Sequence, residues 1–187
     1  MNQATQLADA LQLWDIHIAL TREVIIAATL NSGNLTSSLN ALLLNQVNIG
    51  NNYALTYGQA VGNEYTRLLT IHINLAVDIV MDSLKKNTAK AAVDTALWYN
   101  NADEISLFLS TVSNGRINYE TVRALYYAHL KCTLDEATFI ISKNWAASLV
   151  EMQTCYTHIK ELVLYMASIQ YSGTSGQKWC KKHNKYH

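Results

Sequence analysis

The chain has 187 residues and a formal net charge of zero; half of its residues are hydrophobic and only 15% are charged. This length suits one domain with a substantial core, and the neutral charge gives no electrostatic basis for binding nucleic acid. The low charged fraction indicates that much surface is buried, in the core or against a second copy, so we expect a homo-oligomer.

No apolar run approaches the roughly 18 residues that a membrane span requires, so we expect no membrane partner. Residues 1–9 are polar and lack a basic stretch followed by an apolar one, which indicates that no secretory signal is present. The three cysteines are an odd number and too few for a disulfide framework. They therefore predict a reducing, cytoplasmic location.

Apolar residues at helical spacing predict six helices and no strand. We expect the helices at residues 5–30, 35–57, 60–86, 88–112, 118–142 and 145–171. Turn and capping residues mark the breaks, and the junction at Lys143-Asn144 is the tightest. Asn34 is expected to cap the second helix. Gly58 and Gly62 favour a helix cap or a close helix crossing between the second and third helices.

The odd-numbered helices carry a repeated pattern. His17, His72 and His129 lie 55 and 57 residues apart, and each follows a leucine by four residues and precedes an acid by six. The even-numbered helices carry a weaker series of polar residues, 56 and 57 residues apart: Asn45, Asn101 and His158. Two helices per repeat of about 56 residues predict three tandem αα-hairpins in an all-α, up-and-down six-helix bundle.

That bundle is expected to form one domain over residues 1–171. Residues 172–187 differ in composition, because a stretch of Gly, Ser and Thr is followed by basic and aromatic residues. We expect this segment to be a C-terminal tail outside the bundle. Weak binding through residues 178–187 is the one nucleic-acid contact that the sequence suggests.

The four histidines outside the tail lie near helix midpoints, which share one level in an antiparallel bundle. Their apolar neighbours predict that the side chains point inward, where an imidazole must be hydrogen-bonded or ligated. Acidic residues lie at helical spacing from the mid-helix histidine and asparagine positions. A set of histidines and carboxylates suits zinc, iron or manganese. The candidate metal ligands are His17, His72, His129, His158, Cys132, Cys155, Glu104 and Glu136.

The last two helices offer a sharper constellation. His129 and Cys132 are three residues apart, and so are Cys155 and His158. If the chain turns back at residues 143 and 144, the histidines face each other and so do the cysteines. One hairpin would then supply two cysteines and two histidines, the ligand set of many structural zinc sites.

Two other interpretations stay open. In the first, the His or Asn of each helix forms a buried hydrogen-bond network that fixes helix register, with Thr21, Gln46 and Thr133 as partners. Alternatively, a histidine acts as a general base in an enzyme. No Glu-x-x-His motif of di-iron bundles is present, and the sequence identifies no reaction. Arg22, near a core face, is expected to extend outward.

Several short runs carry a family resemblance across most of residues 10–170. They are Leu13-Trp14 with His17 and Thr21-Arg22, Asn45-Gln46 with Ile49-Gly50, Tyr57-Gly58 with Gly62, Leu69 with His72-Ile73 and Ala76, Asn101-Ala102-Asp103-Glu104-Ile105, His129 with Thr133, and His158-Ile159. This pattern resembles a family of uncharacterised helical-bundle proteins of bacteria and large DNA viruses. The resemblance implies a helical bundle without an assigned activity. For a viral member it implies an accessory or virion protein, located in the host cytoplasm or the virion.

Overall fold

Six helices follow one another along the chain: α1 Gln3–Thr29, α2 Leu35–Tyr57, α3 Gln59–Leu84, α4 Thr88–Val112, α5 Tyr119–Ile141 and α6 Trp145–Gln170. The structure is a computed structural model that describes residues 2–170. Helices account for 89% of these described residues, and none of them is in a strand. The all-α prediction is therefore confirmed, and each helix end lies within two residues of its predicted position. The predicted tail at residues 172–187 lies outside the described residues.

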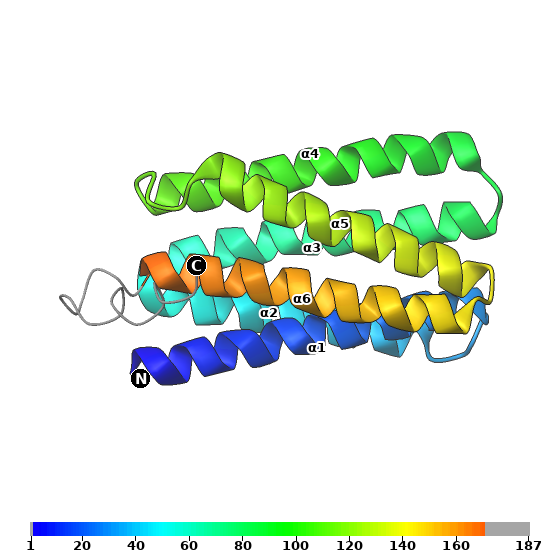
Figure 1. The fold of residues 1–187 in the computed structure, drawn as a ribbon, viewed down its shortest axis with the longest axis horizontal. Helices are drawn as coiled ribbons and strands as arrows, with labels where there is room; N and C mark the ends of the chain where they lie inside the picture. The colour runs from blue at the N-terminus through cyan, green and yellow to red at the C-terminus, as the bar shows by residue number, and fades with distance from the viewer. Residues whose placement is uncertain (1, 171–187) are drawn as a thin grey trace, which may run out of the picture.

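Sequential helices pack side by side along the length of the bundle (Figure 1). The first helix, α1, also packs against α6, so the first and last helices close the bundle, and α1 touches α3 and α5 as well. The start of α1 and the end of α6 lie at the same end of the molecule (Figure 1). None of the described helices combines the length and apolarity needed to cross a membrane.

Four helices end in one type of turn, with a residue of positive φ two positions beyond the helix: Asn31, Lys86, Asn114 and Lys143. The next amide then donates to a carbonyl five residues back, as Asn144 N does to Phe139 O at 2.8 Å. This hydrogen bond satisfies an otherwise unpaired carbonyl of the last turn and reverses the chain within a few residues. The turn after α5 therefore fixes which positions of α5 and α6 face each other.

Asparagines begin several helices. Asn87 and Asn118 each accept a hydrogen bond from the backbone amide three residues later, which satisfies a free donor of the first turn. Asn34 occupies the N-cap position of α2 as predicted, but its side chain makes no such bond. Its side-chain amide donates instead to Glu23 Oε1 at 2.7 Å.

Two glycines bring α2 and α3 into close contact. A Cβ atom built on Gly62 would lie 2.5 Å from Gly50 O and 2.6 Å from the Cβ of Ala54. The predicted close crossing is therefore confirmed at Gly62, because any larger side chain would meet the backbone of α2. Gly58 ends α2 with a φ of 89°, a conformation that side-chain-bearing residues rarely adopt, and its amide donates to Ala54 O.

The replacement Gly62→Ala should lower the free energy of unfolding by about 2 kcal/mol or more, because the added methyl must push two helix backbones apart. Urea unfolding followed by circular dichroism measures this loss. Gly33→Ala is the matched control: a Cβ there meets nothing within 4 Å, so stability should change by less than about 0.5 kcal/mol. Equal stabilities for the two variants would contradict the close crossing.

Candidate functional site

Three histidines lie in the interior on alternate helices. His17 on α1, His72 on α3 and His129 on α5 are only 2–3% exposed. Aromatic rings pack around two of them: Trp14 meets His17 at a ring-centroid distance of 5.2 Å, and Trp98 meets His72 at 4.9 Å. The prediction that these imidazoles point into the core is confirmed.

The α1–α2 hairpin holds His17 through side-chain amides. Gln46 Nε2 lies 3.2 Å from His17 Nδ1 and also donates to Leu42 O at 2.8 Å. Because an amide nitrogen can only donate, this contact favours the tautomer in which His17 Nδ1 accepts and Nε2 carries the proton of the neutral ring. On the same helix, Asn45 Nδ2 donates to Leu13 O at 3.0 Å. Gln46 is thus one of the partners that the network interpretation predicted for the layer.

The α3–α4 hairpin holds His72 with the opposite tautomer. His72 Nδ1 lies 2.8 Å from Asn101 Oδ1, while Asn101 Nδ2 donates to Leu68 O at 3.3 Å. The amide oxygen must accept, so His72 Nδ1 carries the proton and Nε2 keeps its lone pair. That Nε2 atom is buried and has no hydrogen-bond partner among the described residues.

In the α5–α6 hairpin, no amide side chain within residues 2–170 bonds a histidine ring at Nδ1. His129 Nδ1 and His158 Nδ1 are both buried without a hydrogen-bond partner among the described residues, although the His158 residue as a whole is only half-buried. Thr133, a predicted partner, donates its hydroxyl to the His129 carbonyl at 2.9 Å and leaves the ring free. Thr21 Oγ1, the other predicted partner, also lacks a partner within residues 2–170.

Two sulfur atoms lie next to His129. Cys132 on α5 and Cys155 on α6 are paired as a disulfide, with Cα atoms 5.6 Å apart. The predicted apposition of these cysteines across the hairpin is confirmed, whereas the disulfide itself was not expected. One donor atom from each of His129, Cys132 and Cys155 lies within 4.8 Å of the others. Among residues 2–170 these three buried residues are the set that the geometry offers to a metal ion.

Burial is the main cause of the pKa shifts in the layer of mid-bundle histidines formed by His17, His72 and His129. Loss of solvent, reinforced by the nearby His72, lowers the pKa of His17 from 6.5 to about 3. Burial likewise lowers the pKa of His72 to about 4, although its bond to Asn101 opposes the shift. For His129, burial and then the charges of His17, His72 and His158 hold the pKa well below 6.5. All three rings are therefore neutral at pH 7 and can offer lone pairs.

The two candidate carboxylates lie elsewhere. Glu104 is exposed on the surface of α4, where its charge acts on Arg67, so the expectation that it shares a buried face with Asn101 is wrong. Glu136 is buried, but Arg22 Nη1 binds its Oε1 at 2.5 Å. Arg22 also donates to Ser148 Oγ at 3.1 Å, so it points inward rather than outward as predicted. Neither carboxylate belongs to the group of His129.

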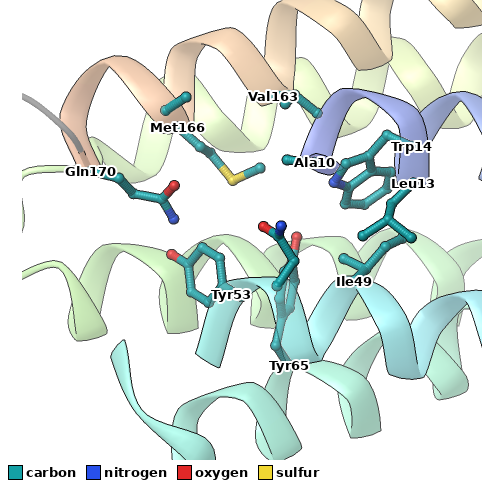
Figure 2. A pocket seen from close by; sticks show the side chains of 11 residues that line it. Ala10, Leu13, Trp14, Ile49, Tyr53, Tyr65, Val163, Met166 and Gln170 are labelled. Carbon is teal, nitrogen blue, oxygen red and sulfur yellow. The ribbon is translucent and has the colours of Figure 1, made fainter. Parts of the chain in front are cut away.

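A separate pocket lies between α1, α2, α3 and α6, nearer the end of the bundle where α6 finishes (Figure 2). Its walls are mostly apolar, with Trp14, Ile49 and Met166 among them, and the polar groups are Tyr53, Tyr65, Asn52 and Gln170. Burial raises the pKa of Tyr65 well above 10, and its hydroxyl lies 2.8 Å from that of Tyr126. The phenols here stay neutral, so this pocket offers no acid or base that acts near pH 7.

The structure thus brings together part of the predicted ligand set. His129, Cys132 and Cys155 form one group, whereas His17, His72 and His158 lie in the same layer but outside that group. No protein-family model, curated protein or solved structure matches this chain. The site therefore has to be interpreted from its own chemistry.

The lowered pKa values predict that the protein loses stability in acid. His17 and His72 stay neutral when folded down to about pH 3 and 4, whereas in the unfolded chain each takes up a proton below about pH 6.5. The free energy of unfolding should therefore be highest above pH 6.5. It should fall towards pH 4 by about 1.4 kcal/mol per pH unit for each such histidine.

Urea unfolding at a series of pH values, with a chelator present, measures this slope. His72→Gln removes one titrating ring, so its slope should be smaller by about 1.4 kcal/mol per pH unit between pH 6 and 4.5. Parallel slopes for the wild type and His72→Gln would show that His72 is not held neutral by the fold.

Proposed function

We propose that the reduced protein binds one transition-metal ion at His129, Cys132 and Cys155. The proposal rests on one geometric fact: these three buried residues present donor atoms within 4.8 Å of one another. They come from facing turns of one hairpin, and the neutral imidazole already has a free lone pair at pH 7. A buried group of one nitrogen and two sulfurs is a typical metal-binding set in proteins.

Zinc fits this donor set better than the other ions that the sequence suggests. Thiolate sulfur is a soft ligand that favours zinc, copper(I) and iron–sulfur centres, whereas manganese prefers carboxylate and other oxygen ligands. Because Glu104 is exposed and Glu136 is bound to Arg22, no free carboxylate supplements the group. Manganese is thus disfavoured, and iron is the second choice after zinc.

His158 is the natural fourth ligand. It lies three residues after Cys155, which places both on one face of α6, and its Nδ1 is buried without a partner among the described residues. The charged form of His158 is also one of the causes of the lowered pKa of His129. A side-chain rotation of His158 would complete the four-coordinate arrangement that structural zinc sites adopt. A water molecule in this position would leave a three-residue site open to a substrate.

The second candidate function is architectural. It is favoured by the matching hydrogen bonds of two hairpins, in which an asparagine donates to the carbonyl four residues before a buried histidine. In this proposal the chain is three tandem αα-hairpins, and the polar layer fixes their register. Exposed apolar side chains such as Leu44, Leu107 and Val150 would then support self-association, as the composition suggests. A virion or accessory role would follow the family resemblance.

Catalysis by His17 or His72 as a general base is the least favoured of the three classes. An effective base has a pKa near the working pH, and burial lowers these two to about 3 and 4.

Cobalt(II) titration tests the metal proposal, because thiolate-bound cobalt absorbs strongly while thiolate-bound zinc does not. The reduced full-length protein should develop thiolate-to-cobalt absorption that saturates at about one equivalent, and zinc should then displace the cobalt. His129→Gln and Cys155→Ser should each weaken or abolish this binding. Circular dichroism shows whether each variant is folded.

His72→Gln is the matched control, since His72 is a buried histidine of the same layer that lies outside the group of three. It should bind cobalt as the wild type does. Loss of binding in this variant would instead indicate a wider four-histidine site, and a folded, reduced wild type that binds no cobalt would end the metal proposal.

A double-mutant cycle tests the architectural proposal. His72→Leu and Asn101→Leu should each cost about 2 kcal/mol, because each leaves a buried polar partner unpaired. The double variant should cost at least 1 kcal/mol less than the two single losses added together. Urea unfolding at pH 7 with a chelator gives the values, and His72→Leu combined with the exposed Lys160→Ala serves as the additive control. Additive losses at His72 and Asn101 would remove the support for a coupled layer.

A further inference from the structure

We propose that oxidation controls the metal site: a peroxide-class oxidant joins Cys132 to Cys155 and releases the ion, and reduction by a dithiol restores the site. This inference rests on the proposed metal binding and adds its regulation. It comes from a double use of the same two sulfurs, which form a disulfide and also lie within ligand reach of His129.

The two uses exclude each other chemically. A metal ion binds the negatively charged thiolate, whereas a disulfide sulfur is neutral and a poor ligand. Once the disulfide forms, His129 and the half-buried His158 are the remaining donors of the proposed site. Two imidazoles hold zinc far more weakly than a set that includes two thiolates, so the ion leaves.

The backbone can stay still during this change. Two sulfurs bound to one tetrahedral zinc ion lie about 3.8 Å apart, as zinc–sulfur bonds of about 2.3 Å require. In a disulfide they lie about 2.05 Å apart. The Cα atoms of Cys132 and Cys155, 5.6 Å apart, suit the disulfide, and rotation of the two side chains accounts for the remaining difference. The turn at Lys143, fixed by the Asn144-to-Phe139 hydrogen bond, keeps the helices in register meanwhile.

The reaction balances with hydrogen peroxide as the oxidant. One thiolate attacks a peroxide oxygen, the O–O bond breaks, and a sulfenic acid and hydroxide form. The second thiolate attacks that sulfur, the S–S bond forms and a second hydroxide leaves. The two hydroxides take up two protons and become water. The two sulfurs lose two electrons in total, the peroxide gains them, and the metal leaves as an aqueous ion with its charge unchanged.

The surroundings of the pair limit competing oxidation. Cys132 and Cys155 are 3% and 1% exposed, so bulky oxidants are excluded and a water-sized peroxide is the class of oxidant that suits the site. The Thr133 hydroxyl lies 3.8 Å from the Cys155 sulfur. Because each sulfur already faces the other, disulfide formation should outrun further oxidation of a sulfenic acid.

The test uses the full-length chain with Cys180→Ser, so that Cys132 and Cys155 are its only thiols. The protein is reduced, loaded with zinc, freed of reductant and treated with hydrogen peroxide in the presence of a zinc-sensitive dye. We expect release of about one zinc per chain together with the loss of both thiols. Peptide mass spectrometry should then identify a Cys132–Cys155 disulfide, and dithiothreitol should restore zinc binding.

The other possible outcomes separate a failure of metal binding from a failure of its regulation. If the folded, reduced protein takes up no zinc, the metal proposal fails, and its regulation fails with it. If zinc binds but peroxide leaves it bound, or releases it with sulfinic acid instead of a disulfide, only the regulation fails.

His129→Gln supplies a second, independent measurement. It keeps both sulfurs but loses the imidazole, so zinc should bind at least tenfold more weakly. In the presence of zinc its disulfide should form faster than that of the parent, because coordination protects the thiolates. Equal rates for the parent and His129→Gln, at a zinc concentration that saturates the parent but not the variant, would contradict competition between zinc and the disulfide.

Discussion

The mid-bundle layer depends on keeping imidazole rings neutral inside an apolar interior. A charged imidazole there would lose its hydration with nothing to replace it, and this is why burial lowers the pKa of His17 and His72 so far. Neutral rings still need partners for their nitrogen atoms. In the first two hairpins an amide from the neighbouring helix meets that need at His17 Nδ1 and His72 Nδ1, whereas the third hairpin supplies no partner to His129 Nδ1 or His158 Nδ1. The candidate metal-binding atoms are therefore found in the α5–α6 hairpin, where no amide among the described residues bonds Nδ1 of either histidine ring.

Helix packing and the turns between helices determine where these metal-binding atoms lie. The short turn after α5 sets Cys132 opposite Cys155, and the packing of α1 against α5 brings Arg22 to Glu136. The ion pair neutralises the one buried carboxylate near this hairpin, even though burial raises the pKa of Glu136. A free carboxylate beside two thiolates would add negative charge in a low-dielectric region. The pairing with Arg22 thus leaves the sulfur atoms as the dominant donors.

The sequence predicted what depends on local spacing. Helix ends follow from turn residues and apolar periodicity, and the cysteine apposition follows from a turn of known length. Glu104 was misplaced because a residue three positions from Asn101 is rotated about 60° around the helix, enough to leave a narrow buried stripe. The Arg22–Glu136 pair joins residues 114 positions apart, a separation over which local spacing carries no information. The tautomers of His17 and His72 could not be predicted from the sequence either, because they depend on which amide atom reaches each ring.

The first two hairpins differ in which nitrogen of the histidine ring carries the proton, and this difference makes the layer asymmetric. Gln46 donates to His17, while Asn101 accepts from His72, so one ring presents an N–H group at Nε2 and the other presents a lone pair. Sequence positions that look equivalent thus have opposite chemical polarity. The layer cannot act as a symmetric cage with equal faces, because α3 contributes a lone pair where α1 contributes an N–H group. A cation or a proton that enters the interior would therefore meet an asymmetric field from the start.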